Sequence, residues 1–125
     1  MRDEYISRRI QSIFPEVSNL TVSKWSTSHT DLHWNNITKR GYILDWESWG
    51  VSIYGNDFAK LYVMSLLNEN VIKYLRTKYI EIFNQKEIKI GILYNISEVI
   101  YMNKTYGDFE DNFVKKCLME SKVFI

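Results

Sequence analysis

The sequence predicts an α+β fold that is mostly helical, with about five helices and one small β-hairpin. Five segments repeat apolar residues every three or four positions, which is typical of helices; they are residues 3–14, 56–67, 70–83, 86–101 and 108–121. The apolar run 42–44 follows a polar segment that contains Gly41, a pattern typical of a hairpin turn. We expect Ile37 and residues 42–45 to be the two arms of this hairpin.

The helix at 56–67 is apolar nearly all round, so we expect it to be buried and to form the centre of the core. On this prediction Leu61 and Met64 are core residues. The first helix is expected to stop before Pro15, because the residue preceding a proline disfavours helix. Residues 48–55 contain two glycines and are expected to form a loop.

The bulk composition indicates one domain, residues 1–125, in the cytoplasm. With 16 basic and 15 acidic residues the net charge is +1, which gives no electrostatic case for a nucleic-acid partner. The single cysteine and the absence of an apolar signal-peptide core fit a reducing compartment. No apolar run approaches the ~18 residues of a membrane span, so we expect no membrane partner.

A motif of polar residues suggests phosphoryl-transfer chemistry. His29, Asp31 and Asn36 form H-x-D-x-x-x-x-N, and Asp45 follows nine residues after Asn36. A carboxylate such as Asp31 can orient a hydroxyl and accept its proton. Asn36 and Asp45 offer the hard oxygen ligands that Mg²⁺ takes.

Residues 29–36, H-T-D-L-H-W-N-N, and residues 42–47, Y-I-L-D-W-E, resemble the aminoglycoside phosphotransferase and choline kinase-like superfamily. Its catalytic loop typically reads H-G-D-L-H-x-x-N, and its metal site reads I-D-W/F-E. The resemblance covers about residues 25–67, and Thr30 stands where the family usually has glycine. It implies the C-terminal lobe of the protein kinase-like fold, with ATP, Mg²⁺ and a small-molecule acceptor. Asp31 would be catalytic, and Asn36 and Asp45 would bind the metal.

Further residues of this region are candidates with two interpretations each. His29 either transfers a proton or, as we prefer, hydrogen-bonds the loop backbone. Glu47 is either a solvated acid or a further contact to metal or to an acceptor amine. Trp34 and Trp49 could stack on a substrate, although packing is the usual role of tryptophan. Asp57 either caps the helix at 56 or resembles the kinase-fold aspartate that holds amides of the catalytic loop.

The favoured function is therefore the catalytic lobe of a small-molecule phosphotransferase, truncated or split. Only 28 residues precede His29 and no G-x-G occurs, so the sequence lacks the strand-rich nucleotide-binding lobe that such enzymes use. We expect residues 1–125 to transfer phosphate poorly unless a partner chain supplies that lobe. The acceptor stays open among aminoglycosides, choline, sugars and amino sugars.

Two alternatives belong to other classes. The chain could be a non-catalytic interaction or regulatory remnant of the same fold. It could also be a metal-dependent hydrolase, because His29, Asp31 and His33 alternate and would share one face of a strand. Together with Asp45 they would then form a transition-metal site.

Overall fold

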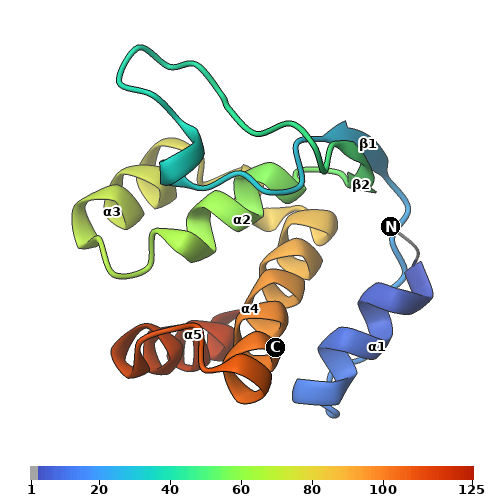
Figure 1. The fold of residues 1–125 in the computed structure, drawn as a ribbon. Helices are drawn as coiled ribbons and strands as arrows, with labels where there is room; N and C mark the ends of the chain where they lie inside the picture. Colours follow the sequence, from blue (N-terminus) through green and yellow to red (C-terminus); the bar gives the residue numbers. More distant parts are fainter. Residues whose placement is uncertain (1–2) are drawn as a thin grey trace.

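The computed structural model describes residues 3–125 and has an α+β fold (Figure 1). This confirms the predicted fold class: five α-helices, two short 3₁₀ helices and one two-stranded sheet make up the described residues. In chain order the elements are α1 (Asp3–Ile13), β1 (Trp25–Ser28), η1 (Trp34–Asn36), β2 (Gly50–Ile53), α2 (Asn56–Met64), α3 (Glu69–Lys78), η2 (Ile82–Asn84), α4 (Lys86–Tyr106) and α5 (Asp111–Phe124).

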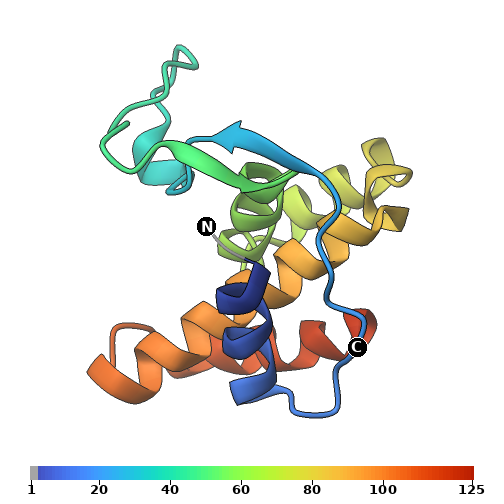
Figure 2. The ribbon, with the colours of Figure 1, turned by 90° about the vertical axis from the view of Figure 1, so that its right-hand side faces the viewer.

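Helix α4 forms the centre of the core. The prediction that the helix at 56–67 would do so is wrong. It contacts α1, α2, α5 and η2, and it crosses the middle of the molecule in Figures 1 and 2. Isoleucines recur along it on more than one face, so 12 of its 21 residues are buried. The helix expected at 56–67 ends at Met64, and its predicted core residues Leu61 and Met64 are only half-buried. Its deeply buried side chains are Tyr62 and Val63 instead.

Two glycines allow α2 to lie close against α4. A Cβ at Gly91 would lie 3.1 Å from the Cβ of Ala59, which is tight for two helices in contact. Gly55 precedes α2 with a φ of 76°, and a Cβ there would lie 2.2 Å from the Cδ1 of Ile88. The start of α2 is therefore fixed against the first turn of α4.

The sheet differs from the predicted hairpin. Strand β1 pairs antiparallel with β2, from Trp25 opposite Ile53 to Ser28 opposite Gly50, so residues 48–55 contain a strand where a loop was expected. The predicted hairpin arms pair over a short stretch, at one bridge between Ile37 and Ile43. Two backbone hydrogen bonds flank this bridge, from the N–H of Thr38 to the carbonyl oxygen of Tyr42 and from the N–H of Leu44 to that of Asn36. Directly after it, Asp45 adopts a φ of 59°, which lies outside the extended region.

The sheet lies at the end of the molecule opposite α5, over the start of α2, in both ribbon views (Figures 1 and 2). Between its two strands the chain makes the long loop that contains every motif residue singled out above except Asp57. None of the helices in residues 3–125 has the length and apolar character needed to cross a membrane.

Candidate catalytic loop and adjoining cavity

Asp57 holds the start of the candidate catalytic loop. Its Oδ2 accepts a hydrogen bond from the backbone N–H of His29 at 2.8 Å, and its Oδ1 accepts one from the N–H of Thr30 at 3.0 Å. These are the contacts that the resemblance to the kinase fold implied for Asp57. The alternative role as a helix cap is wrong, because Gly55 occupies the N-cap position and Asp57 lies in the first turn.

His29 is buried, at 2% exposure, and both of its ring nitrogens bond backbone groups. Nε2 lies 2.6 Å from the carbonyl oxygen of Leu44 and therefore carries the hydrogen that it donates. Nδ1 accepts the N–H of Asp31 at 3.2 Å. The ring of Trp46 packs edge-on against the imidazole at 4.7 Å. These contacts match the preferred interpretation of His29 as a residue that stabilises the loop, and they leave neither nitrogen free for proton transfer.

Thr30 adopts the left-handed backbone conformation, with a φ of 73°. For a β-branched residue this conformation is strained, and glycine, which stands here in the family that the motif resembles, adopts it freely. Its backbone N–H donates to Asp57, and its side-chain Oγ1 donates to the carbonyl oxygen of Ser48 at 2.6 Å. The two hydrogen bonds hold the strained residue in place.

Asn36, on η1, presents its side-chain oxygen as the free end of the amide. Both hydrogens of Nδ2 are engaged, one by the carbonyl oxygen of Asp31 at 2.9 Å and the other by Nε2 of His33 at 3.2 Å. No residue in the described part of the chain donates to its Oδ1. Fixing the amide nitrogen in this way directs the oxygen, which is the atom that binds a metal ion.

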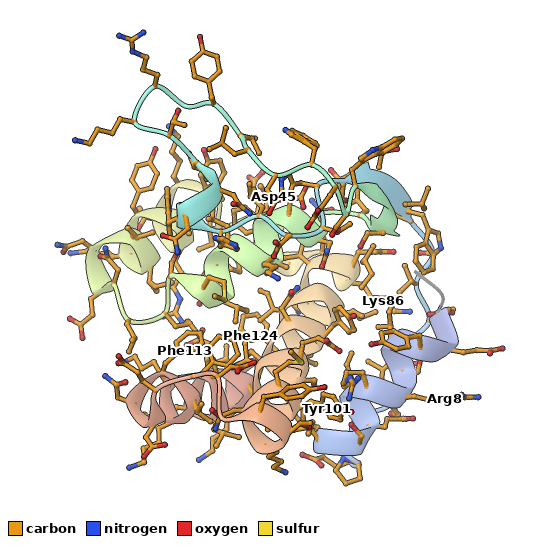
Figure 3. All side chains as sticks on the ribbon, viewed as in Figure 1. Arg8, Asp45, Lys86, Tyr101, Phe113 and Phe124 are labelled. Carbon is orange, nitrogen blue, oxygen red and sulfur yellow. The ribbon has the colours of Figure 1, made fainter. Side chains whose placement is uncertain are left out.

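A backbone hydrogen bond connects Asn36 to the residue that precedes Asp45. The N–H of Leu44 donates to the carbonyl oxygen of Asn36 at 2.7 Å, so Asp45 is one residue from this link. Its side chain is exposed, and Figure 3 labels it where the long loop passes over α2 in that view. The two oxygen donors suit Mg²⁺, although phosphate oxygens would have to complete its shell.

The hydrolase alternative finds no support in the described residues. Residues 29–33 form no strand, so the alternation of His29, Asp31 and His33 does not place them on one face. Across residues 3–125 no group of three or more His, Cys, Asp and Glu side chains could hold a metal ion. The ring of His29 is in any case committed to the backbone.

Asp31 forms an ion pair that the sequence analysis missed. Its Oδ1 lies 3.2 Å from Nζ of Lys60 and 3.8 Å from Nε2 of His33, whereas no described residue bonds its Oδ2. Lys60 follows Asp57 by three positions on α2, so the two side chains share one face of that helix. Once Asp57 is placed against the loop, this spacing of three residues predicts that Lys60 also faces the loop.

A cavity of about 420 Å³ opens beside Asp31, between the loop, α2 and α4. Its polar lining comprises Thr30, Asp31, His33, Asn56, Lys60, Asn95 and Glu98, and its apolar lining comprises Val63, Met64, Tyr94, Val99, Met102 and Phe109. The contribution of α4 has no signal in the sequence, because residues 94–98 are about 65 positions from Asp31. The cavity is large enough for a small organic molecule.

The other candidate residues lie outside this cavity. Trp34 is half-exposed, and its Nε1 donates to Oγ of Ser65 at 2.7 Å, which fixes the loop to the end of α2. Trp49 is 64% exposed and Glu47 is exposed, so both remain accessible to a ligand or partner. The structure thus gathers Asp31, Asn36 and Asp57 around the loop and leaves Glu47 and Trp49 on its outer side.

Comparison of the chain with protein-family models, with curated proteins and with solved structures gave no match in any of the three. The family resemblance therefore rests on the motif residues themselves and on the contacts described above.

Proposed function

We propose that this chain is the catalytic lobe of an ATP-dependent phosphotransferase that acts on a hydroxyl group of a small molecule. One observation carries the proposal: hydrogen bonds of His29 and Leu44 connect the loop of Asp31 and Asn36 to the segment before Asp45, and Asp57 accepts the N–H of His29 at the start of this loop. Phosphoryl transfer needs little covalent chemistry from the protein, and its rate comes mainly from such fixed positioning.

Each residue has a role that fits its contacts. Asp31 would orient the acceptor hydroxyl through its unbonded Oδ2 and take up the hydroxyl proton. The acceptor oxygen would bond to the γ-phosphorus of ATP as the bond to ADP breaks. Asn36, through its directed Oδ1, and Asp45 would hold Mg²⁺, which neutralises charge on the phosphates. His29 and Asp57 would be positioning residues.

The lobe that covers the nucleotide is not among the described residues, whose sheet has two strands. A kinase-type site also needs a glycine-rich loop and a lysine directed at the phosphates. We therefore expect residues 1–125 to bind Mg²⁺-nucleotide weakly and to turn it over slowly without a second chain.

The metal-binding part of the proposal is tested by titrating Mn²⁺, monitored by electron paramagnetic resonance, in the presence of ATP. The wild type should bind more tightly than Asp45→Asn. Asp111→Asn serves as a control because Asp111 is an exposed aspartate of α5 without a charged partner in residues 3–125. Equal affinity of the wild type and Asp45→Asn would contradict the proposal.

The catalytic part is tested by ADP production with Mg²⁺-ATP and a panel of sugars, amino sugars and amino alcohols. Slow turnover that disappears in Asp31→Asn is the expected result. Turnover near ~1 s⁻¹, the lower end of the kinase range, would show that the chain needs no further lobe.

A non-catalytic interaction module is the second candidate, and the exposed apolar side chains of residues 42–51 favour it. Tyr42, Leu44, Trp46, Trp49 and Val51 are each about half-exposed or more, and an apolar surface of this kind often marks a partner site. This candidate gains support if Asp45→Asn changes neither metal nor nucleotide binding.

A further inference from the structure

The floor of the cavity beside Asp31 is formed by two buried asparagines. Asn56, at the start of α2, is 2% exposed, and Asn95, in the middle of α4, is 7% exposed. Nδ2 of Asn95 donates to Oδ1 of Asn56 at 3.0 Å and to the carbonyl oxygen of Gly91 at 2.7 Å. Since a carbonyl can only accept, the bond to Gly91 fixes the orientation of both amides.

This arrangement leaves a donor and an acceptor facing the cavity. Both hydrogens of Asn95 are used, so its Oδ1 is spare, and both hydrogens on Nδ2 of Asn56 are spare. No residue among 3–125 bonds either group, and both residues line the cavity. No buried side-chain nitrogen or oxygen in residues 3–125 lacks a hydrogen-bond partner, so these two spare groups are open to the cavity, where a ligand hydroxyl can bond both of them.

Each acidic side chain of the cavity lining already has a cationic partner, Lys60 within the lining for Asp31 and Arg9 outside it for Glu98. Asp31 lies 3.2 Å from Lys60, and Glu98 accepts from Nε of Arg9 at 2.6 Å. The guanidinium of Arg9 also stacks on the ring of Tyr101 at 3.5 Å, which fixes it in place. A cationic ligand would find no unpaired acid here and would meet the ammonium of Lys60.

We propose that this cavity binds a neutral polyhydroxy acceptor, a sugar or polyol, with one hydroxyl at Asp31 and another between Asn56 and Asn95. A hydroxyl both donates and accepts, so it satisfies the Asn56 donor and the Asn95 acceptor together. The apolar lining, with Tyr94 and Phe109, suits the C–H faces of a sugar ring. Naming the ligand an acceptor rests on the proposed phosphotransferase function, whereas its binding does not.

The experiment is a nuclear magnetic resonance titration of ¹⁵N-labelled protein without nucleotide, following the side-chain amide signals of Asn56 and Asn95. The probes are D-ribose, D-glucose and myo-inositol as neutral polyols, and kanamycin and choline as cations. At least one polyol should shift both signals, and kanamycin and choline should leave them unchanged at equal concentration. No shift with any polyol, or tighter binding of either cation, overturns the proposal.

Two variants with matched controls make the test specific. Asn56→Asp keeps the oxygen that bonds Asn95 and removes the spare donor, so polyol binding should fall about tenfold, the loss of one hydrogen bond. Asn70→Asp is its control, an exposed asparagine in the first turn of α3. Lys60→Gln should raise the affinity for kanamycin about threefold or more, and Lys73→Gln on α3 should not. Unchanged polyol binding by Asn56→Asp would refute the assigned site.

The readouts separate this inference from the proposed function. Polyol binding at Asn56 and Asn95 without ADP production dependent on Asp31 would refute the phosphotransferase and keep the binding site. ADP production with kanamycin but with no neutral polyol would keep the phosphotransferase and refute the acceptor class.

Discussion

Replacing Asp57 by asparagine should loosen the candidate catalytic loop and destabilise the protein. Each carboxylate oxygen accepts one backbone N–H, from His29 at 2.8 Å and from Thr30 at 3.0 Å. In the variant one oxygen remains, and the new amide group points its own hydrogens at the second N–H. A hydrogen bond to a charged group contributes about 1.5–3 kcal/mol, so we expect the free energy of unfolding to fall by about that amount.

The matched control is Asp111→Asn. Asp111 also lies in the first turn of a helix, but it is exposed and holds no loop, so its loss should cost only the helix-dipole share of about 0.3–1 kcal/mol. Urea denaturation measures both changes, and amide hydrogen exchange at His29 and Thr30 reports the loop directly. If Asp57→Asn costs no more than Asp111→Asn and leaves the exchange of these two amides unchanged, the assignment of Asp57 to the loop is refuted.

Three further predictions test the core and the pH dependence of stability. Leu66→Ala should lower the free energy of unfolding by about 2–5 kcal/mol, whereas its half-exposed neighbour Leu67→Ala should cost less than about 1 kcal/mol; urea denaturation compares them. Gly55→Ala should cost about 1–3 kcal/mol and speed exchange of the loop amides, because its Cβ meets α4 at 2.2 Å and φ is 76°; unchanged stability would contradict the packing. The hydroxyl of Ser23, which donates to the carboxylate of Glu87 at 2.7 Å, lowers the pKa of Glu87 in the folded state. Stability from this contact is therefore present above the ordinary pKa of glutamate, about 4.3, and is lost as pH falls through the lower folded value; Ser23→Ala should weaken that acid dependence in denaturation curves from pH 3 to 6.

The sequence predicted the parts of the fold that depend on local pattern. The helical segments have strong apolar periodicity, and each corresponds to an observed helix whose ends differ by up to five residues. The contact of Asp57 with the loop amides was one of two interpretations of that residue, and it came from the resemblance to the kinase fold. The short strand β2 could not be predicted from its four residues G-V-S-I. They lie between Trp49 and Tyr54 in a segment with two glycines, and such a segment is equally typical of a loop.

The sequence did not predict features that depend on packing between distant segments. Whether α2 or α4 is central depends on which helix the others cover, and both are strongly apolar. The pair of Asn56 and Asn95 joins residues 39 positions apart and has no local signature. A hydrophobic pattern locates helices along the chain, but the polar floor of a cavity appears only when two helices pack together.

The contacts that hold the loop bear on what a separate nucleotide-binding lobe would add. Thr30 and Asp45 both have positive φ values, 73° and 59°. This conformation costs a threonine about 1–3 kcal/mol and an aspartate less, and it persists only where the surroundings hold it. Here the surroundings do so without any ligand: Asp57 binds the amide of Thr30, and His29 binds the carbonyl of Leu44 beside Asp45. The loop is therefore fixed by α2 and by hydrogen bonds within the loop itself. If residues 1–125 transfer phosphate slowly, the deficit should lie in holding and shielding the triphosphate, and Asp31 should keep its geometry. A slow wild type with protected loop amides fits this view, whereas rapid exchange of the His29 and Thr30 amides in the wild type would show that the loop itself needs a second lobe.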